Sequence, residues 1–285
     1  MLAQQLINGL VLGSIYALSA LGFTLIFGVA RIVNFAYGEF MMLGAFLTLT
    51  TMSMTGTSFF VALPVAMVLT ALLSVVAYLL VIRPVIRGTQ LQALLVTTGL
   101  LYVLREVAIL IWGTAPRQLE SGLDGALEVG EIIVTHQRLL AVAMLVVMVS
   151  VLYAMLYRMR IGRALRAVAQ NRFGAEAIGL NIDRVIGFAF AFSGAMACVA
   201  GSLIGALYAT DPGMGSAPLL KSFVIVIFGG LGSVPGAIVG GLVIGLAETL
   251  FGAYVSNAFK DVFTFLIMLG VLLWRPTGLL GVRST

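Results

Sequence analysis

The sequence predicts an all-α polytopic membrane protein, and its composition carries most of that prediction. Hydrophobic residues make up 61% of the 285 positions, whereas charged residues make up only 9%. Soluble globular domains contain about 25% charged residues. The apolar runs are also continuous and lack the alternation of barrel strands, and a helix satisfies its own backbone hydrogen bonds in lipid. We therefore expect a bundle of membrane-spanning helices.

Apolar runs of roughly 20 residues are candidate spans, because a helix of that length crosses the hydrocarbon core. In chain order they lie at 5–29, 38–55, 59–82, 92–113, 139–157, 186–209, 234–252 and 262–274, with a shorter run at 213–231. The sequence thus predicts eight or nine transmembrane helices, some of them short or broken. The number depends on whether 213–231 crosses fully.

The basic residues predict the orientation, because Lys and Arg collect in cytoplasmic loops. With nine spans, one side receives Arg31, Arg83, Arg87, Arg158, Arg160, Arg163, Arg166, Arg172, Arg184, Arg275 and Arg283. The other side receives Arg117, Arg138 and Lys260, and its longest loop is acidic through Glu120, Asp124, Glu128 and Glu131. We expect the N-terminus outside and the C-terminus in the cytoplasm. A re-entrant 213–231 would put the last arginines outside, so a crossing, although broken, is preferred.

Two breaks interrupt the apolar sequence. Residues 33–39, VNFAYGE, separate the first two spans, and 229–236, GGLGSVPG, interrupt the late ones. Non-helical backbone at membrane depth is tolerated where it is buried in protein or lines a watery cavity, so paired breaks that come together indicate a permeation pathway. Alternatively, both are cytoplasmic turns, with Asn34 capping the second span and Glu39 in its first turn. The predicted pathway residues are Asn34, Phe35, Tyr37, Gly38, Glu39, Gly229, Gly230, Gly232 and Ser233.

Four charged residues fall inside predicted spans, namely Arg105, Glu106, Lys221 and Glu248. An Arg, Lys or Asp costs roughly 2.5–3.5 kcal/mol at the centre of a lone helix, so these side chains need partners. Neighbouring residues point about 100° apart on a helix, which favours pairing between helices, such as Glu106 with Lys221. A structural role is favoured over proton coupling or ligand contact.

Glycines four residues apart allow helices to approach closely. The pairs are Gly9 with Gly13, Gly201 with Gly205, Gly236 with Gly240, and Gly241 with Gly245. We favour packing inside the subunit over dimer contact.

Enzymatic chemistry is not expected. The sequence contains no GxxxxGK[ST] phosphate-binding loop and no nucleophile, metal or flavin constellation. We therefore expect no cofactor in this chain, and any ATP-driven step requires another polypeptide.

The segment 158–184 is the longest strongly basic insert. From Arg163 the text ALRAVAQ predicts a helical turn or two, and FGAEAIG predicts a second short helix ended by Gly179. Asn181 or Asp183 is expected to cap the span that begins near Val185. Short helices that project from a membrane subunit suit a groove on a cytosolic partner.

Four ordered blocks carry a family resemblance: LGFTLIFGVARIVNFAYGEFMMLGAF, RALRAVAQNRFGAEAIGLNIDRV, FGGLGSVPGAIVGGLVIGLAE and KDVFTFLIMLGVLLWRPTGLLG. Over nearly the whole chain they resemble branched-chain amino-acid ABC importer permeases, specifically the shorter of that system's two permease subunits. The resemblance implies one transmembrane permease domain over 1–285, multi-pass in the plasma (inner) membrane of a prokaryote. Two departures are Tyr37, where many relatives carry histidine, and GAEAIG in place of a full EAA sequence.

The resemblance also implies partners. These are a second permease subunit, either a paralogue or a second copy, two cytosolic ATPase subunits that carry ATP and Mg, and a periplasmic or extracellular protein that binds leucine, isoleucine or valine. Membrane lipids surround the chain, and no nucleic acid is involved. The predicted ATPase-coupling residues are Arg163, Arg166, Ala175, Glu176, Ala177 and Gly179.

The expected mechanism is alternating access, with the substrate passing between subunits. One alternative is an importer permease for urea or short amides, because related permeases share the NFA-x-GE block. Another is an ion-coupled secondary transporter with Glu39, Glu106 or Glu248 as its coupling site. The basic docking segment argues against the second alternative.

Overall fold

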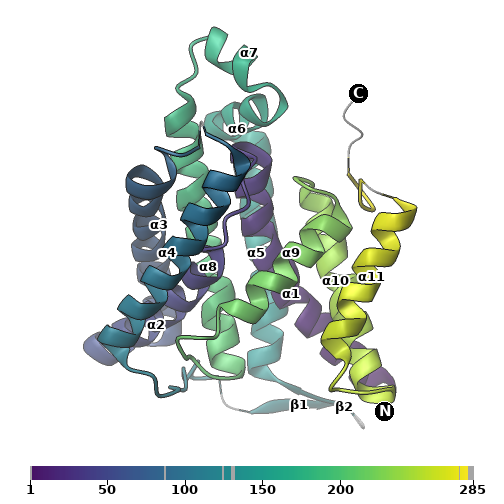
Figure 1. Cartoon of the computed structure of the whole chain (residues 1–285). Coiled ribbons are helices and arrows are strands. Elements are labelled where there is room, and N and C mark those ends of the chain that lie inside the picture. The colour runs from purple at the N-terminus through teal and green to yellow at the C-terminus, as the bar shows by residue number, and fades with distance from the viewer. Residues whose placement is uncertain (1, 87, 124, 130–131, 276, 282–285) are drawn as a thin grey trace.

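Each predicted span is a helix within a few residues of its expected bounds (Figure 1). The computed structural model describes residues 2–86, 88–123, 125–129, 132–275 and 277–281. The helices in the expected spans are α1 (Leu2–Ala30), α2 (Tyr37–Thr55), α3 (Phe59–Ala77) with its π-helical continuation η1 (Tyr78–Ile82), α4 (Gln90–Trp112), α5 (His136–Arg158), α8 (Ile182–Leu207), α9 (Ser216–Gly229), α10 (Val234–Tyr254) and α11 (Lys260–Trp274). Four residues of the charge count lie outside the described residues: Arg87, Asp124, Glu131 and Arg283.

Length and composition divide these helices. Among the described residues, six helices are long and apolar enough to cross a membrane: α1, α3 with η1, α4, α5, α8 and α10. In contrast, α9 has only 14 residues. It is about 21 Å long and falls short of a hydrocarbon core of about 30 Å. The chain is thus a multi-pass membrane protein with at least one short helix.

The molecule has two distinct ends (Figure 1). Helices α6 (Arg160–Gln170) and α7 (Arg172–Ala177) project at one of them, here called the α7 end. At the opposite, hairpin end lies an antiparallel pair, β1 (Ala126–Val129) and β2 (Ile132–Thr135). The all-α prediction missed this hairpin. Gln4, in the first turn of α1, binds the backbone of β2. Its amide nitrogen donates to the Ile133 carbonyl at 2.9 Å, and its amide oxygen accepts from the Ile133 N–H at 2.9 Å.

Helices α1 and α8 form the buried centre of the bundle, with 78% and 72% of their most apolar stretches buried. Their glycines permit this. A Cβ added at Gly13 of α1 would lie 2.9 Å from the Cα of Leu242 and 3.0 Å from the carbonyl oxygen of Gly241, both on α10. On α8, Gly201 packs directly against the backbone of Met41. The glycine pairs therefore pack helices together inside the subunit, as expected.

Candidate translocation and coupling sites

The first break returns the chain from the α7 end into the bundle. Helix α1 ends before Arg31, which has a φ of 54° and donates from Nη2 to the carbonyl of Ala169 in α6 at 3.1 Å. Residues 31–34 are not helical, and α2 begins at Tyr37, which is fully buried. Asn34 is also buried, and its Oδ1 accepts a hydrogen bond from the N–H of Ala36 at 3.1 Å. Ala36 is the N-cap of α2, so the capping role that the alternative, turn interpretation assigns to Asn34 is wrong.

A second non-helical stretch enters from the hairpin end. Arg117 and Thr210 exchange backbone hydrogen bonds of 2.9 and 2.8 Å, and α9 begins a few residues later at Ser216. The starts of α2 and α9 touch, because a Cβ on Gly38 would overlap the carbonyl oxygen of Gly215, and the converse also holds. From this contact α2 runs toward the hairpin end and α9 toward the α7 end (Figure 1). Two helix N-termini thus meet inside the bundle.

Arg105 of α4 joins these two helix starts. Its Nη2 donates to Glu39 Oε1 at 2.6 Å and to Ser216 Oγ at 2.7 Å. The Glu39 side chain is 1% exposed, whereas that of Arg105 is 24% exposed. Glu39 lies in the first turn of α2 as predicted, where the helix dipole favours a carboxylate.

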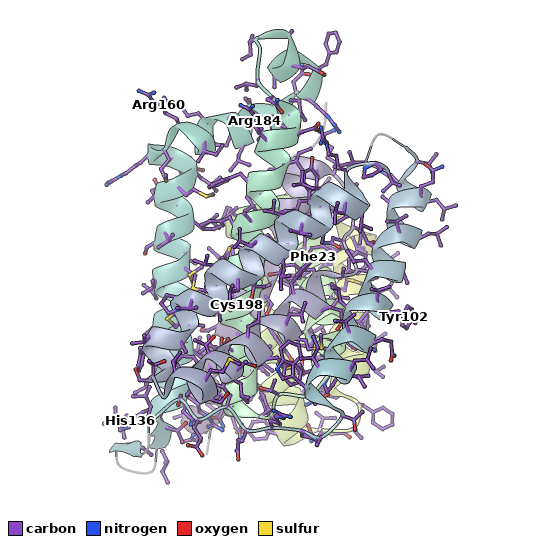
Figure 2. All side chains as sticks on the ribbon, turned by 90° about the vertical axis from the view of Figure 1, so that its left-hand side faces the viewer. Phe23, Tyr102, His136, Arg160, Arg184 and Cys198 are labelled. Carbon is purple, nitrogen blue, oxygen red and sulfur yellow. The ribbon has the colours of Figure 1, made fainter. Side chains whose placement is uncertain are left out.

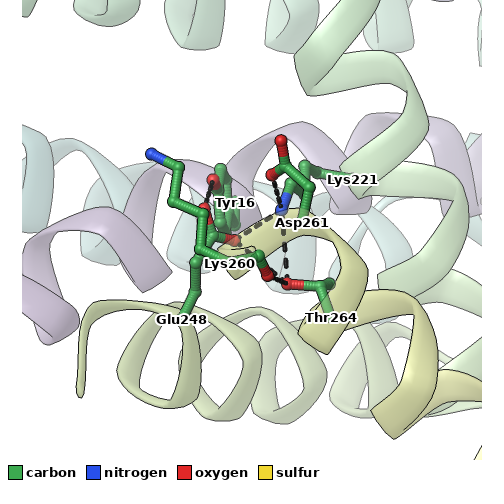
Figure 3. Close-up of polar contacts among 6 residues, drawn as sticks. All are labelled: Tyr16, Lys221, Glu248, Lys260, Asp261 and Thr264. Atoms are coloured by element: carbon green, nitrogen blue, oxygen red, sulfur yellow. Dashed lines mark hydrogen bonds and ion pairs between the residues drawn. The ribbon is translucent and has the colours of Figure 1, made fainter. Parts of the chain in front are cut away.

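A second charge cluster ties four helices, α1, α9, α10 and α11 (Figure 3). Lys221 Nζ of α9 lies 2.7 Å from Glu248 Oε2 of α10 and 2.7 Å from Asp261 Oδ1 of α11. The Tyr16 hydroxyl of α1 donates to Glu248 Oε1 at 3.1 Å, and the Thr264 hydroxyl donates to Glu248 Oε2 at 3.3 Å. Both carboxylate oxygens of Glu248 are therefore hydrogen-bonded.

The expected pairing of Glu106 with Lys221 is wrong. Lys221 is buried between α10 and α11 with two carboxylates of its own. Glu106 is exposed on α4 and forms no ion pair with any residue that the structure describes. Its sequence neighbour Arg105 points instead toward α2 and α9.

The second break lies at the α7 end. Gly230 and Gly232 follow α9 with φ of 108° and 81°, which favour glycine. Ser233 caps α10 by accepting a hydrogen bond from the N–H of Gly236 at 3.1 Å. The N–H groups of Leu279 and Leu280 donate to the carbonyls of Phe228 and Gly229 at 2.8 and 2.9 Å, so the C-terminal segment covers this break.

The two predicted breaks do not come together. Gly38 packs at the start of α9, whereas Gly232 follows its end and lies against Gly28 of α1. The 14 residues of α9 separate them, about 21 Å of helix. What the fold does bring together is Arg166 of α6 with Gly232 and Ser233, around a cavity of about 400 Å³ that is also lined by α1 and α5.

The coupling segment forms the two predicted short helices. Figure 2 places Arg160 and Arg184 at the end from which α7 projects, and His136 at the opposite end. Asn171 caps α7, and Asn181 caps α8 by accepting from the N–H of Arg184 at 3.1 Å. Asp183, the other predicted cap, instead pairs with Arg83 at 2.6 Å. Gly179 has the expected positive φ, 85°.

Exposure divides the predicted coupling residues. Arg163, Glu176, Ala177 and Gly179 are exposed, whereas Ala175 is buried and the Arg166 guanidinium stacks 4.7 Å from the centre of the Tyr157 ring. Two apolar residues that the sequence analysis did not select complete the exposed tip: Phe173 is 83% exposed and Ile178 76%. The sequence did contain a signal for this tip, because Phe173 and Ile178 are large apolar residues in a basic segment that lies outside every predicted span. An exposed apolar tip beside arginines suits a protein partner.

Comparison with known proteins assigns a context to this geometry. A family described as the permease component of the branched-chain amino acid transport system matches residues 5–272. The high-affinity branched-chain amino acid permease LivH of Salmonella typhimurium is 36% identical, covering 98% of this chain and 95% of the relative. BraD of Pseudomonas aeruginosa is 33% identical with the same coverage. LivM of Escherichia coli is 24% identical over 98% of this chain and 71% of LivM. No solved structure matches the chain.

Proposed function

Because this chain belongs to the branched-chain amino acid permease family, we propose that it is the transmembrane subunit of an ATP-driven, binding-protein-dependent importer of leucine, isoleucine and valine. The observation that carries the proposal is similarity over 98% of the chain to permeases of that system at 33–36% identity. The family is a transporter component and not an enzyme. Its LivH and LivM members are two permeases of one kind of transport system, which supports a second permease subunit as the partner.

The proposed topology has nine crossings, with the N-terminus outside and the C-terminus in the cytoplasm of a prokaryotic inner membrane. The α7 end carries the basic segment and is the cytoplasmic side. Helices α2 and α9 each complete a crossing that begins as non-helical chain, the first from the α7 end and the second from the hairpin end. This supports a broken but full crossing for 213–231.

The proposed motor lies on partner chains. Two cytosolic ATPase subunits carry ATP and Mg and receive the exposed tip formed by Phe173, Glu176, Ala177 and Ile178. When the ATPases close, the tip moves, and α6 passes the movement to α1 and α10 around the cavity beside Arg166 and Gly232. A substrate-binding protein delivers the amino acid at the hairpin end. The pathway then alternates its opening, and no covalent step is required.

Reconstitution tests this proposal. The chain, its partner permease, the ATPases and the binding protein are placed in liposomes with ATP inside, and uptake of labelled leucine is measured. We expect uptake that requires both ATP and the binding protein and that persists when ion gradients are collapsed. Uptake driven by an ion gradient without ATP, or ATP-driven uptake of urea but not leucine, would contradict the proposal.

A further inference from the structure

Two ionisable residues lie within α4 at a depth where lipid would be expected, and they point in different directions: Arg105 toward α2 and α9, and Glu106 outward. Arg105 lies 15 residues after Gln90 and 7 before Trp112, about 22 and 10 Å along the helix. Its side chain is 24% exposed, and Glu106 is exposed. Ionisable side chains inside membrane spans face the protein interior or a water-filled cavity. Arg105 therefore faces the interior of the bundle, whereas the exposed Glu106 borders water or a partner subunit.

The junction of the α2 and α9 starts, which Arg105 contacts, contains unsatisfied polar atoms of both kinds. Glu39 Oε2, Arg105 Nε and Asn34 Nδ2 are buried and form no hydrogen bond within the part of the chain that the structure describes. Glu39 and Asn34 are 0% and 1% exposed. A buried polar group without a partner destabilises the fold, and more so when it is charged. The Glu39–Arg105 pair thus has one unpaired acceptor, Glu39 Oε2, and one unpaired donor, Arg105 Nε.

The charge cluster around Lys221 provides the contrast. There both oxygens of Glu248 are hydrogen-bonded, by Tyr16 on one side and by Lys221 and Thr264 on the other. A purely structural ion pair is expected to look like that one. In the Glu39–Arg105 pair, one carboxylate oxygen and the guanidinium Nε are buried and have no partner among the described residues.

Apolar surface is supplied by α9 and by the residue before the N-cap of α2. Phe35 immediately precedes the N-cap of α2, and Phe223 lies two turns into α9, with ring centres 6.4 Å apart. Both side chains are only partly buried. The junction therefore combines opposite charges with an aromatic wall.

We propose that Arg105, Glu39 and Ser216 form a binding station for the charged end of an α-amino acid on its way through the permease. The substrate carboxylate binds the Arg105 guanidinium, and the N-termini of α2 and α9 favour its negative charge. The substrate ammonium donates to the unpaired oxygen of Glu39. The aliphatic side chain packs against Phe35 and Phe223. This inference rests on the proposed function, because it names the residues that contact the transported amino acid.

Access is tested first. The buried Cys198 is replaced by alanine, Ser216→Cys is introduced, and the assembled transporter is treated in proteoliposomes with negatively and positively charged methanethiosulfonates. We expect the anionic reagent to react at least about fivefold faster, a preference that Arg105→Gln abolishes. Leucine supplied with its binding protein and ATP should slow the reaction. An unreactive Ser216→Cys, a rate independent of reagent charge, or no protection during leucine transport would overturn the proposal.

A charge exchange separates substrate contact from structural pairing. Arg105→Gln and Glu39→Gln should each lower leucine uptake at least about tenfold, because each removes a charged hydrogen bond to substrate. The exchanged pair Arg105→Glu with Glu39→Arg should restore assembly and binding-protein-stimulated ATPase activity but not uptake. Uptake restored to within twofold by the exchange would show that the pair is structural. Arg83→Gln, in the exposed pair with Asp183, is the matched control and should leave uptake unchanged.

The two proposals fail in distinguishable ways. If the unmodified assembly imports no leucine, the proposed function is wrong. If it imports leucine and the exchanged pair of Arg105 and Glu39 restores uptake to within twofold, only the binding station is wrong.

Discussion

The buried charge cluster of Lys221, Glu248 and Asp261 gives a stability prediction that the structure quantifies. Lys221 and Glu248 have side chains 8% and 2% exposed at a separation of 2.7 Å, whereas Asp261 is 63% exposed. Replacing Glu248 with methionine leaves Lys221 in a dry site with one partner at its water-exposed edge. It also removes the acceptor of the Tyr16 hydroxyl.

The magnitude follows from the desolvation of the remaining charge. Removing one member of a buried ion pair costs about 3–5 kcal/mol, so Glu248→Met and Lys221→Met should each lower the free energy of unfolding by that amount. The double variant Lys221→Met with Glu248→Met leaves no buried charge in the cluster, because the Asp261 side chain is 63% exposed. It should therefore be more stable than either single variant.

Reversible unfolding in mixed micelles of mild detergent and dodecyl sulfate measures these differences. Asp183→Asn serves as the control, because its partner Arg83 is 52% exposed and an exposed pair contributes about 0–1 kcal/mol. A double variant that loses as much as the two single variants combined would refute the reasoning. It would mean that the attraction between the charges itself stabilises the bundle. The cost of burying each charge would then not explain the effect of the single variants.

Three further predictions concern packing, coupling and orientation. Gly38→Ala should lower the free energy of unfolding by about 1–3 kcal/mol and reduce the yield of folded protein, because the added methyl group meets the Gly215 carbonyl. Gly99→Ala is the control and should be tolerated, because Gly99 has open space around it. Equal yields of the two variants would contradict the close approach of α2 and α9. Gly179→Val should leave the folded permease in the membrane but reduce ATPase binding and uptake, because a φ of 85° strains a residue with a Cβ by about 1–2 kcal/mol. Gly179→Asn should reduce uptake less. Normal uptake by the valine variant would show that this turn has no part in coupling. In a Cys198→Ala background, Glu120→Cys should react with an impermeant maleimide from outside intact cells and Gln170→Cys only after permeabilisation, and the reverse pattern would overturn the orientation.

Hydropathy was sufficient to locate the spans, because burial in lipid constrains every residue of a crossing helix. It also identified 213–231 as the doubtful span, which the structure resolves into a non-helical leg and α9. The hairpin was missed because four-residue strands in a polar loop leave little pattern, and β2 is held partly by Gln4, which lies 129 residues earlier in the sequence. Capping and glycine rules predicted Asn181 and Gly179 correctly, since both depend on neighbours within a few residues.

Contacts between helices were harder to predict, because they depend on how far each helix is rotated and how deep it starts. Gly38 was predicted as a pathway residue, a role that stays a prediction; the structure shows instead a backbone contact with Gly215 that requires glycine at this position. Phe173 and Ile178 were overlooked because their exposure depends on how α7 projects. The breaks looked alike in sequence, yet they lie at opposite ends of α9.

The charged residues within spans show most clearly why sequence alone was insufficient. The costs of Arg105 and of Lys221 in a lone helix are similar, so both were expected to need partners. In the fold, Lys221 and Glu248 have a closed set of hydrogen bonds, whereas Glu39 keeps one free oxygen and Arg105 a free Nε. A saturated pair holds helices together and gains nothing from a ligand. An unsaturated pair at the meeting point of two helix N-termini is stabilised when a zwitterion completes it, which is why the same kind of sequence signal supports a structural role at one position and a transport role at the other.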